Sequence, residues 1–139
     1  MLFDNNKNKG RAGIALAIAY YGANGYTVSL PLNDTQDYDI VIEKDNNFET
    51  VQCKFTGKDN NQVGLRTCGC NTKGSKVYKT VIDTNVDYLF CVDKEQNLFH
   101  IPVSEIRKYG NTNALTLRVK PALRRNKFSF PSEKYLVKI

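Results

Sequence analysis

The chain has 139 residues, of which 41% are hydrophobic, and this is the length of one domain with a core of its own. Its 20 basic and 14 acidic residues give a net charge of +6, which points to a polyanionic partner, nucleic acid first, with ordinary solubility charge as the alternative. No run of about 18 apolar residues indicates a membrane span, and no basic and apolar N-terminal stretch indicates a secretory signal. We therefore expect a single domain over residues 1–139 in the cytoplasm.

The first predicted element is a helix over residues 8–23. Ile14, Ile18 and Tyr21 fall at i, i+4 and i+7 on one stripe, and the segment is rich in alanine. Gly25 is placed to end the helix in a left-handed turn. The stripe predicts that the helix packs one face against the rest of the domain.

Three strands are predicted next, over residues 26–30, 37–42 and 48–54. The last two are joined by the tight polar turn of residues 44–47 and therefore form a hairpin. Side chains two residues apart on a strand share a face, so the second strand of this hairpin presents its polar side chains together.

The hairpin brings Asp39 close to Gln52 and Lys54 on one face. A carboxylate, an amide oxygen and an amine in one place suit the binding of a divalent cation and a water beside a phosphate. Asp39, Gln52 and the backbone carbonyl of Cys53 are the candidate metal ligands, and Lys54 is the candidate group that positions or activates the water. The alternatives are a turn-capping role for Asp39 and a solvated outer face for Gln52 and Lys54.

The rest of the chain alternates strands with polar connections. We predict, in chain order, a strand over 63–68, a basic connection over 69–76, a hairpin of 87–92 and 97–102 with a turn at 93–96, a short helix from Ser104, a strand over 114–120 and a basic connection over 123–127. One helix followed by many strands predicts an α/β or α+β domain with a central mixed sheet.

The chain contains four cysteines, Cys53, Cys68, Cys70 and Cys91. A cytosolic chain of this length needs no disulfides, and Cys53 and Cys91 lie in apolar strand patterns, so we expect both to be reduced core residues. A zinc site is the alternative, and the Cys68-Gly69-Cys70 spacing does not favour it.

Asp39, twelve intervening residues and Gln52-Cys53-Lys54 resemble the motif of the PD-(D/E)XK nucleases, with glutamine at the D/E position. Residues 9–13, 25–28, 38–42, 99–103 and 115–118 are similar to the archaeal Holliday-junction-resolvase-like branch of that superfamily, which includes a cyanobacterial group I intron homing endonuclease. The resemblance implies a restriction-endonuclease-like core, a sheet flanked by helices and a Mg²⁺- or Mn²⁺-dependent endonuclease acting on double-stranded DNA. It also implies that Asp39, Gln52 and Lys54 are catalytic.

The sequence departs from this resemblance at Ile14. The first helix of these nucleases presents a glutamate to the metal, and Ile14 occupies the matching position. Three explanations remain open: the metal is held with more water ligands; Asp34 or Asp37 substitutes for the glutamate; or the chain is a DNA-binding protein that keeps the nuclease fold with weakened or no cleavage.

Basic residues along the chain are candidates for phosphate contacts, which supply affinity rather than sequence choice. They are Lys9, Arg11, Lys58, Arg66, Lys73, Lys76, Arg118, Lys120, Arg124, Arg125 and Lys127. Cutting both strands of a duplex needs two active sites or two visits, so we expect a homodimer or homotetramer. The remaining alternative is a structural or interaction domain with no role on nucleic acid.

Overall fold

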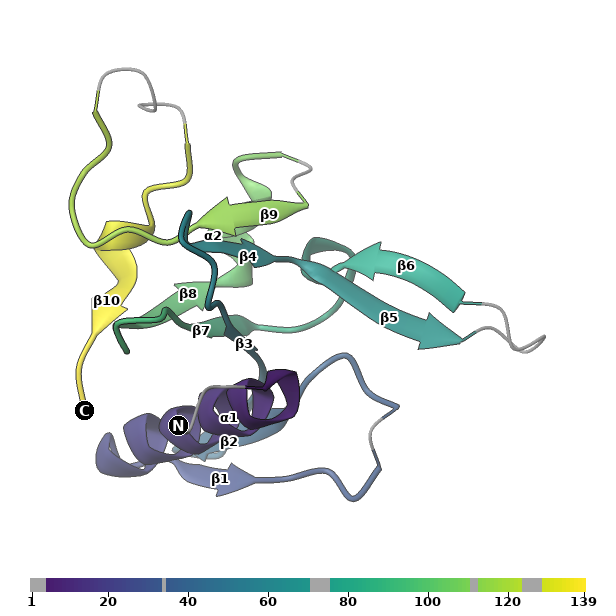
Figure 1. Cartoon of the computed structure of the whole chain (residues 1–139). Coiled ribbons are helices and arrows are strands. Elements are labelled where there is room, and N and C mark those ends of the chain that lie inside the picture. The colour runs from purple at the N-terminus through teal and green to yellow at the C-terminus, as the bar shows by residue number, and fades with distance from the viewer. Residues whose placement is uncertain (1–4, 34, 71–75, 111–112, 124–128) are drawn as a thin grey trace.

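The computed structural model describes residues 5–33, 35–70, 76–110, 113–123 and 129–139, with the backbone alone at 68–70 and 76–78. These residues are arranged around a six-stranded sheet with the strand order β1-β2-β3-β7-β8-β10 (Figure 1). The strands are β1 (Thr27–Ser29), β2 (Ile40–Lys44), β3 (Asn47–Phe55), β7 (Tyr88–Val92), β8 (Leu98–Pro102) and β10 (Leu136–Val137). Neighbouring strands run antiparallel except β3 and β7, which run parallel, so the predicted central mixed sheet is confirmed.

The predicted hairpin is formed by β2 and β3. Its register pairs Lys44 with Asn47 across the turn. Asp45 and Asn46 take the left-handed conformation, with φ of 54° and 63°, which asparagine and aspartate tolerate better than other side chains. The second predicted hairpin is β7 with β8. Both hairpins are therefore confirmed.

The helix α1 (Asn6–Ala23) packs on one face of the sheet. Asn5 caps it by accepting a hydrogen bond from the backbone N–H of Asn8 at 2.8 Å, so the helix begins two residues before the predicted start. Gly25, with φ of 82°, provides the predicted left-handed turn after the helix.

The fully buried stripe of α1 differs from the predicted one. Its members are Gly13, Ala17 and Tyr21, whereas Ile14 and Ile18 are half-buried at its side. Two of the three buried residues are small, so the helix backbone lies close to the sheet. None of the helices among the described residues has the length and apolar character needed to cross a membrane.

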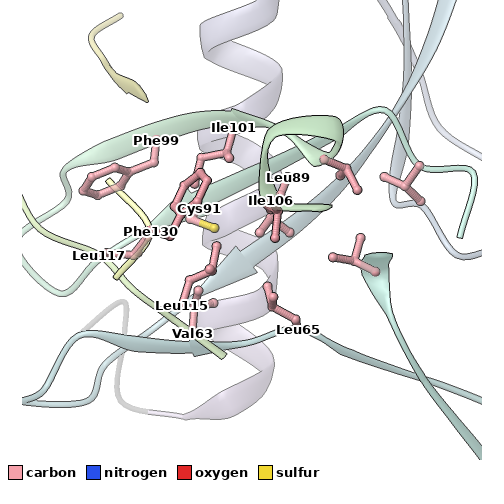
Figure 2. Packing of buried hydrophobic residues seen from close by; sticks show 13 residues of the cluster. Val63, Leu65, Leu89, Cys91, Phe99, Ile101, Ile106, Leu115, Leu117 and Phe130 are labelled. Atoms are coloured by element: carbon pink, nitrogen blue, oxygen red, sulfur yellow. The ribbon is translucent and has the colours of Figure 1, made fainter. Parts of the chain in front are cut away.

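The other face of the sheet is covered by short elements: β4 (Gln62–Gly64), β9 (Ala114–Thr116), the 3₁₀ turns η1 (Val81–Asp83) and η3 (Ser132–Tyr135), and α2 (Val103–Arg107). Figure 2 shows the apolar cluster between them and the sheet. Leu89 and Cys91 of β7 point into this cluster, whereas Phe90 and Val92 point towards α1, as the alternation along a strand requires.

β5 (Arg66–Cys70) and β6 (Lys76–Thr80) pair antiparallel and form a ribbon that extends away from the sheet (Figure 1). The prediction of one strand over 63–68 is therefore wrong, because β4 pairs with β9 and β5 pairs with β6. The prediction of a connection over 69–76 is wrong at both ends, where the backbone is paired, and its centre at 71–75 lies outside the described residues.

The strand predicted over 114–120 is shorter than expected, because β9 ends at Thr116. Beyond it, the N–H of Leu117 donates to the carbonyl of Asn61 at 3.0 Å, and the N–H of Arg118 donates to Ser132 Oγ at 3.0 Å. The first bond continues the register of β9 with β4 by one residue, and the second joins the chain to Ser132. The end of the connection predicted at 123–127 lies outside the described residues.

Candidate active site

The β2–β3 hairpin positions the three candidate catalytic side chains. Asp39 directly precedes β2, and its N–H donates to the carbonyl of Val51 at 2.9 Å. Ile40 pairs with Val51, which places Asp39 beside Gln52 on the next strand. Gln52 and Lys54 lie two residues apart on β3 and share the face that Asp39 faces.

Asp39 and Gln52 are in direct contact. The Nε2 of Gln52 donates to Oδ2 of Asp39 at 2.8 Å, and the backbone N–H of Cys53 donates to the same oxygen at 2.7 Å. Among the described residues, no hydrogen bond reaches the other carboxylate oxygen, Oδ1. One side of the carboxylate is thus fixed by protein, and the other is open to a ligand.

Burial raises the pKa of the Asp39 carboxyl above its ordinary value. The N–H of Cys53 and the positive charge of Lys54 act in the opposite direction on this pKa without cancelling the effect of burial. The ionised carboxylate is therefore poorly compensated by its protein surroundings. A bound cation is the kind of partner that would compensate it.

Lys54 is held by a different part of the chain. Its Nζ donates to the backbone carbonyl of Arg66, at the start of β5, at 3.1 Å. The ammonium group remains close enough to Asp39 to influence its pKa. The site therefore gathers Asp39, Gln52 and Lys54 as the hairpin pattern predicts, with β5 as an additional support.

A cavity of about 590 Å³ opens beside Asp39. Its walls come from α1, the segment after β1 and the segment before β2. The lining residues are Ile14, Leu30, Pro31, Leu32, Asn33, Gln36, Tyr38 and Asp39. Ile14 and Asp39 thus line one cavity, to which the first helix contributes an apolar side chain.

The comparison with protein families identifies the class of the protein. A family model described as PD-(D/E)XK endonuclease matches residues 4–135. The chain belongs to this family. A bacterial homing endonuclease, I-Ssp6803I, has a similar structure, with a TM-score of 0.64 and 20% sequence identity over 95% of this chain and 87% of that chain. At this identity the similarity shows a shared fold. The comparison with curated proteins finds no match.

The site of this endonuclease offers few metal ligands. Among the described residues, no three histidine, cysteine, aspartate or glutamate side chains gather in one place. The available oxygen atoms are the Asp39 carboxylate, the Gln52 amide oxygen and the Cys53 carbonyl. This set of hard oxygen donors fits Mg²⁺, which keeps several waters and takes few protein ligands. Gln52 presents its nitrogen to Asp39, which leaves its oxygen for a cation.

The two other acids considered as substitutes for the helix glutamate are not equivalent. Oδ2 of Asp37 accepts from Nζ of Lys79 at 2.9 Å, so this carboxylate is engaged in an ion pair. Asp34 lies outside the described residues. In this structure Asp37 is therefore engaged with Lys79.

The candidate phosphate contacts of the endonuclease differ in their surroundings. Arg11, Lys58, Arg66 and Lys120 have exposed side chains, and Lys9 is half-buried near Gly57. Arg118 is paired with Glu133 at 2.9 Å and bonded to Ser129, which indicates a structural role. Lys76 is described only in its backbone. Lys73, Arg124, Arg125 and Lys127 lie outside the described residues.

Sequence reasoning missed the contribution of the β5–β6 ribbon to the site. Lys79 and the carbonyl of Arg66 reach Asp37 and Lys54 because the base of the ribbon lies beside the hairpin. No local pattern in the sequence indicates these contacts, since a backbone carbonyl carries no residue signature and Lys79 is one of many lysines. Only the pairing of β5 with β6 identifies them.

Proposed function

We propose that the chain is a Mg²⁺- or Mn²⁺-dependent endonuclease that hydrolyses phosphodiester bonds in double-stranded DNA. The observation that carries the proposal is the convergence of Asp39, Gln52 and Lys54 on one hairpin of a chain that belongs to the PD-(D/E)XK endonuclease family. The net charge of +6 supports a phosphate-rich substrate. The structural similarity to a homing endonuclease supports DNA as that substrate.

The proposed mechanism assigns one task to each residue. Asp39, Gln52 and the carbonyl of Cys53 would hold the cation. When bound, the cation polarises the phosphoryl oxygen and acidifies a water. Lys54, held by the carbonyl of Arg66, directs its ammonium towards the phosphate and the attacking water. The N–H of Cys53 keeps the carboxylate in place during the reaction.

Cleavage of both strands requires two such sites. We propose that a homodimer or homotetramer supplies them, with the exposed basic residues Arg11, Lys58, Arg66 and Lys120 binding phosphates of the duplex. A symmetric assembly would match a target with the same symmetry.

Plasmid cleavage tests the proposal. We expect the wild-type chain to nick supercoiled plasmid with Mg²⁺ and to be inactive with EDTA. Asp39→Asn removes the only carboxylate among the three proposed ligands, so we expect a loss of at least about 10²- to 10³-fold, as for the removal of one key electrostatic group. Asp45→Asn, in the exposed β2–β3 turn, is the matched control and should cleave normally. Equal cleavage by wild type and Asp39→Asn would refute the proposed function.

Ile14 favours a second candidate function, a DNA-binding protein with weakened cleavage. Because Ile14 lines the cavity beside Asp39, Ile14→Glu would add a carboxylate to the proposed metal site. If activity has been weakened at this position, we expect Ile14→Glu to cleave faster and at lower Mg²⁺ concentration than wild type. Ile18→Glu, on a half-buried residue one turn further along α1, is the control for a buried charge. Destabilisation by both variants without a gain in cleavage would identify position 14 as packing alone.

A further inference from the structure

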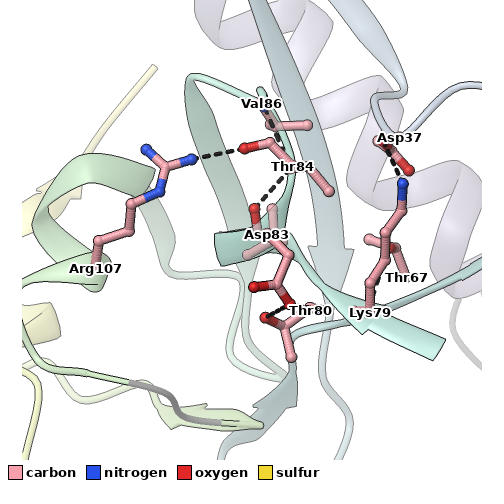
Figure 3. A network of polar contacts seen from close by, with 9 residues as sticks. Asp37, Thr67, Lys79, Thr80, Asp83, Thr84, Val86 and Arg107 are labelled. Carbon is pink, nitrogen blue, oxygen red and sulfur yellow. Dashed lines mark hydrogen bonds and ion pairs between the residues drawn. The ribbon is translucent and has the colours of Figure 1, made fainter.

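The base of the β5–β6 ribbon makes two contacts beside the active site, one from each strand. On β6, Nζ of Lys79 donates to Oδ2 of Asp37 at 2.9 Å, as Figure 3 shows. Asp37 lies two residues before Asp39, on the segment that leads into β2. Lys79 therefore holds the backbone that presents the proposed metal-binding carboxylate.

On β5, the carbonyl of Arg66 accepts the hydrogen bond from Nζ of Lys54 at 3.1 Å. Arg66 pairs with Thr80, and Thr67 pairs with Lys79, so the two contacts come from adjacent steps of the same ladder. The base of the ribbon thus contacts both Asp37, on the segment that carries Asp39, and the side chain of Lys54.

The base of the ribbon is itself fixed to the body of the protein. The N–H and Oγ1 of Thr80 both bond to Oδ2 of Asp83 at 3.2 and 3.1 Å (Figure 3). Arg107 of α2 donates to the carbonyls of Ile82 and Thr84 at 3.0 and 2.6 Å. The Thr80–Asp83 bonds cap the turn η1 that follows β6, and the Arg107 bonds join this turn to α2, so the base of the ribbon is attached to α2.

The Lys79–Asp37 ion pair has little value as a stabilising contact. The two side chains are 39% and 36% exposed, and ion pairs with such exposure contribute little to folding stability. Its position, between the ribbon and the segment that carries Asp39, gives it a geometric role instead. A displacement of about 1 Å in a catalytic group can reduce the rate by as much as roughly a hundredfold.

We propose that the base of the β5–β6 ribbon is a positioning device for the active site, and that Lys79 is a positioning residue that acts through Asp37 on Asp39. The inference rests on the proposed endonuclease function. Lys79 touches neither the metal nor the scissile phosphate in this proposal. It sets the separation between Asp39 and the lysine that the carbonyl of Arg66 holds.

The test is a steady-state comparison of Lys79→Ala, Asp37→Asn and the double variant on the same plasmid. We expect each single variant to lower kcat by roughly tenfold to a hundredfold with KM changed by less than about threefold. The double variant should lose no more than either single variant, because both substitutions remove one interaction. Lys79→Arg keeps the charge and the reach, and should restore most of kcat.

DNA affinity in EDTA, measured by fluorescence anisotropy, separates positioning from phosphate binding. If Lys79 only bound phosphate, Lys79→Ala would weaken DNA binding and Asp37→Asn, which removes a negative charge, would strengthen it. Such opposite effects with unchanged kcat would overturn the inference. Positioning predicts instead that both variants lose kcat and keep their thermal denaturation temperature within about 2–4 °C of wild type.

Lys94→Ala is the matched control, because Lys94 has the same 39% exposure and pairs with Asp59 at 3.0 Å in a different part of the surface. It should cleave at the wild-type rate. Normal cleavage by Lys79→Ala, with Asp39→Asn inactive, would overturn this inference and leave the proposed function standing. No cleavage by the wild-type chain would overturn both.

Discussion

At the scale of single residues, Asp39 combines a fixed geometry with an unfavourable environment. Two donors hold one of its oxygens, yet burial still raises the pKa of the carboxyl. A raised pKa in the folded state means that the folded chain binds the proton more tightly than the unfolded chain does. The ionised Asp39 side chain therefore lowers the stability of the folded protein, which retains it because the proposed site needs a carboxylate.

This environment predicts a pH dependence of stability. In the absence of divalent cations, we expect Asp39→Asn to be more stable than wild type near about pH 7, because the variant carries no desolvated charge. The difference should shrink as the pH falls through the folded pKa of Asp39 towards the unfolded value of about 3.9, where wild type is protonated. Urea denaturation midpoints at several pH values measure the effect. A wild type that is more stable than Asp39→Asn at neutral pH without metal would contradict it.

Added Mg²⁺ provides the control for this prediction. A ligand that binds the folded state alone stabilises it, so Mg²⁺ should raise the denaturation midpoint of wild type and leave that of Asp39→Asn unchanged.

Some contacts of the site residues could be predicted from the sequence, and others could not. Asp39, Gln52 and Lys54 are close in sequence and follow strand alternation, so their approach on one hairpin was predictable. The ion pair of Lys79 with Asp37 spans distant parts of the chain, and the support of Lys54 is a backbone carbonyl. Neither contact produces a pattern in the local sequence.

At the scale of elements, the packing of α1 on β3 depends on Gly13. A Cβ placed on Gly13 would lie 3.8 Å from the carbonyl oxygen of Lys54 and 3.8 Å from Cβ of Phe55, which is ordinary van der Waals contact. The space therefore accepts a methyl group and little more. The helix surface at this position rests directly on the part of β3 that carries the proposed catalytic lysine.

We expect Gly13→Ala to stabilise the protein by about 0.5–1 kcal/mol through its better helix propensity, with cleavage unchanged. Gly13→Leu should instead push α1 away from β3, cost about 1–3 kcal/mol, and reduce cleavage through displacement of Lys54. Thermal denaturation and plasmid cleavage measure the two effects. Gly10, with open space around it, is the control position, where both substitutions should be tolerated. Normal activity and stability in Gly13→Leu would show that the contact is not tight.

Elements that depend on local pattern were predictable, and elements that depend on distant partners were not. The helix α1 and the two hairpins carry clear periodicity and turn residues. The ribbon has a polar, glycine-containing sequence, and the parallel pairing of β3 with β7 joins strands separated by all of β4, β5 and β6. The chain leaves the β4–β9 ladder where the N–H of Arg118 bonds to Ser132, which only the folded chain brings near.

At the scale of the whole molecule, the net charge of +6 predicts DNA binding that weakens steeply with salt. Each phosphate contact that is lost should reduce the slope of log affinity against log salt concentration by about 0.9. We expect Lys120→Ala, at an exposed residue, to reduce the slope by about this amount and leave stability unchanged. Anisotropy titrations between low and moderate salt provide the measurement.

We expect Arg118→Ala to show the opposite pattern in the same measurement, with lower stability and an unchanged salt slope. The side chains of Arg118 and Glu133 are only 17% and 15% exposed, so we expect a loss of about 1–3 kcal/mol of stability and little change in the salt slope. A slope that falls equally in both variants would place Arg118 on the DNA as well. Binding of either variant that does not respond to salt would contradict the phosphate-based interface.

The left-handed turn at Asp45 and Asn46 helps to fix the register of β3 against β2. Because side chains alternate across a strand, a one-residue slip of β3 against β2 would move Gln52 and Lys54 to the face that packs on α1 and bring Cys53 to the face that they now occupy. The turn need not touch substrate to control the reaction. The length of that loop therefore constrains the reaction as firmly as the identity of the acid in front of β2 does.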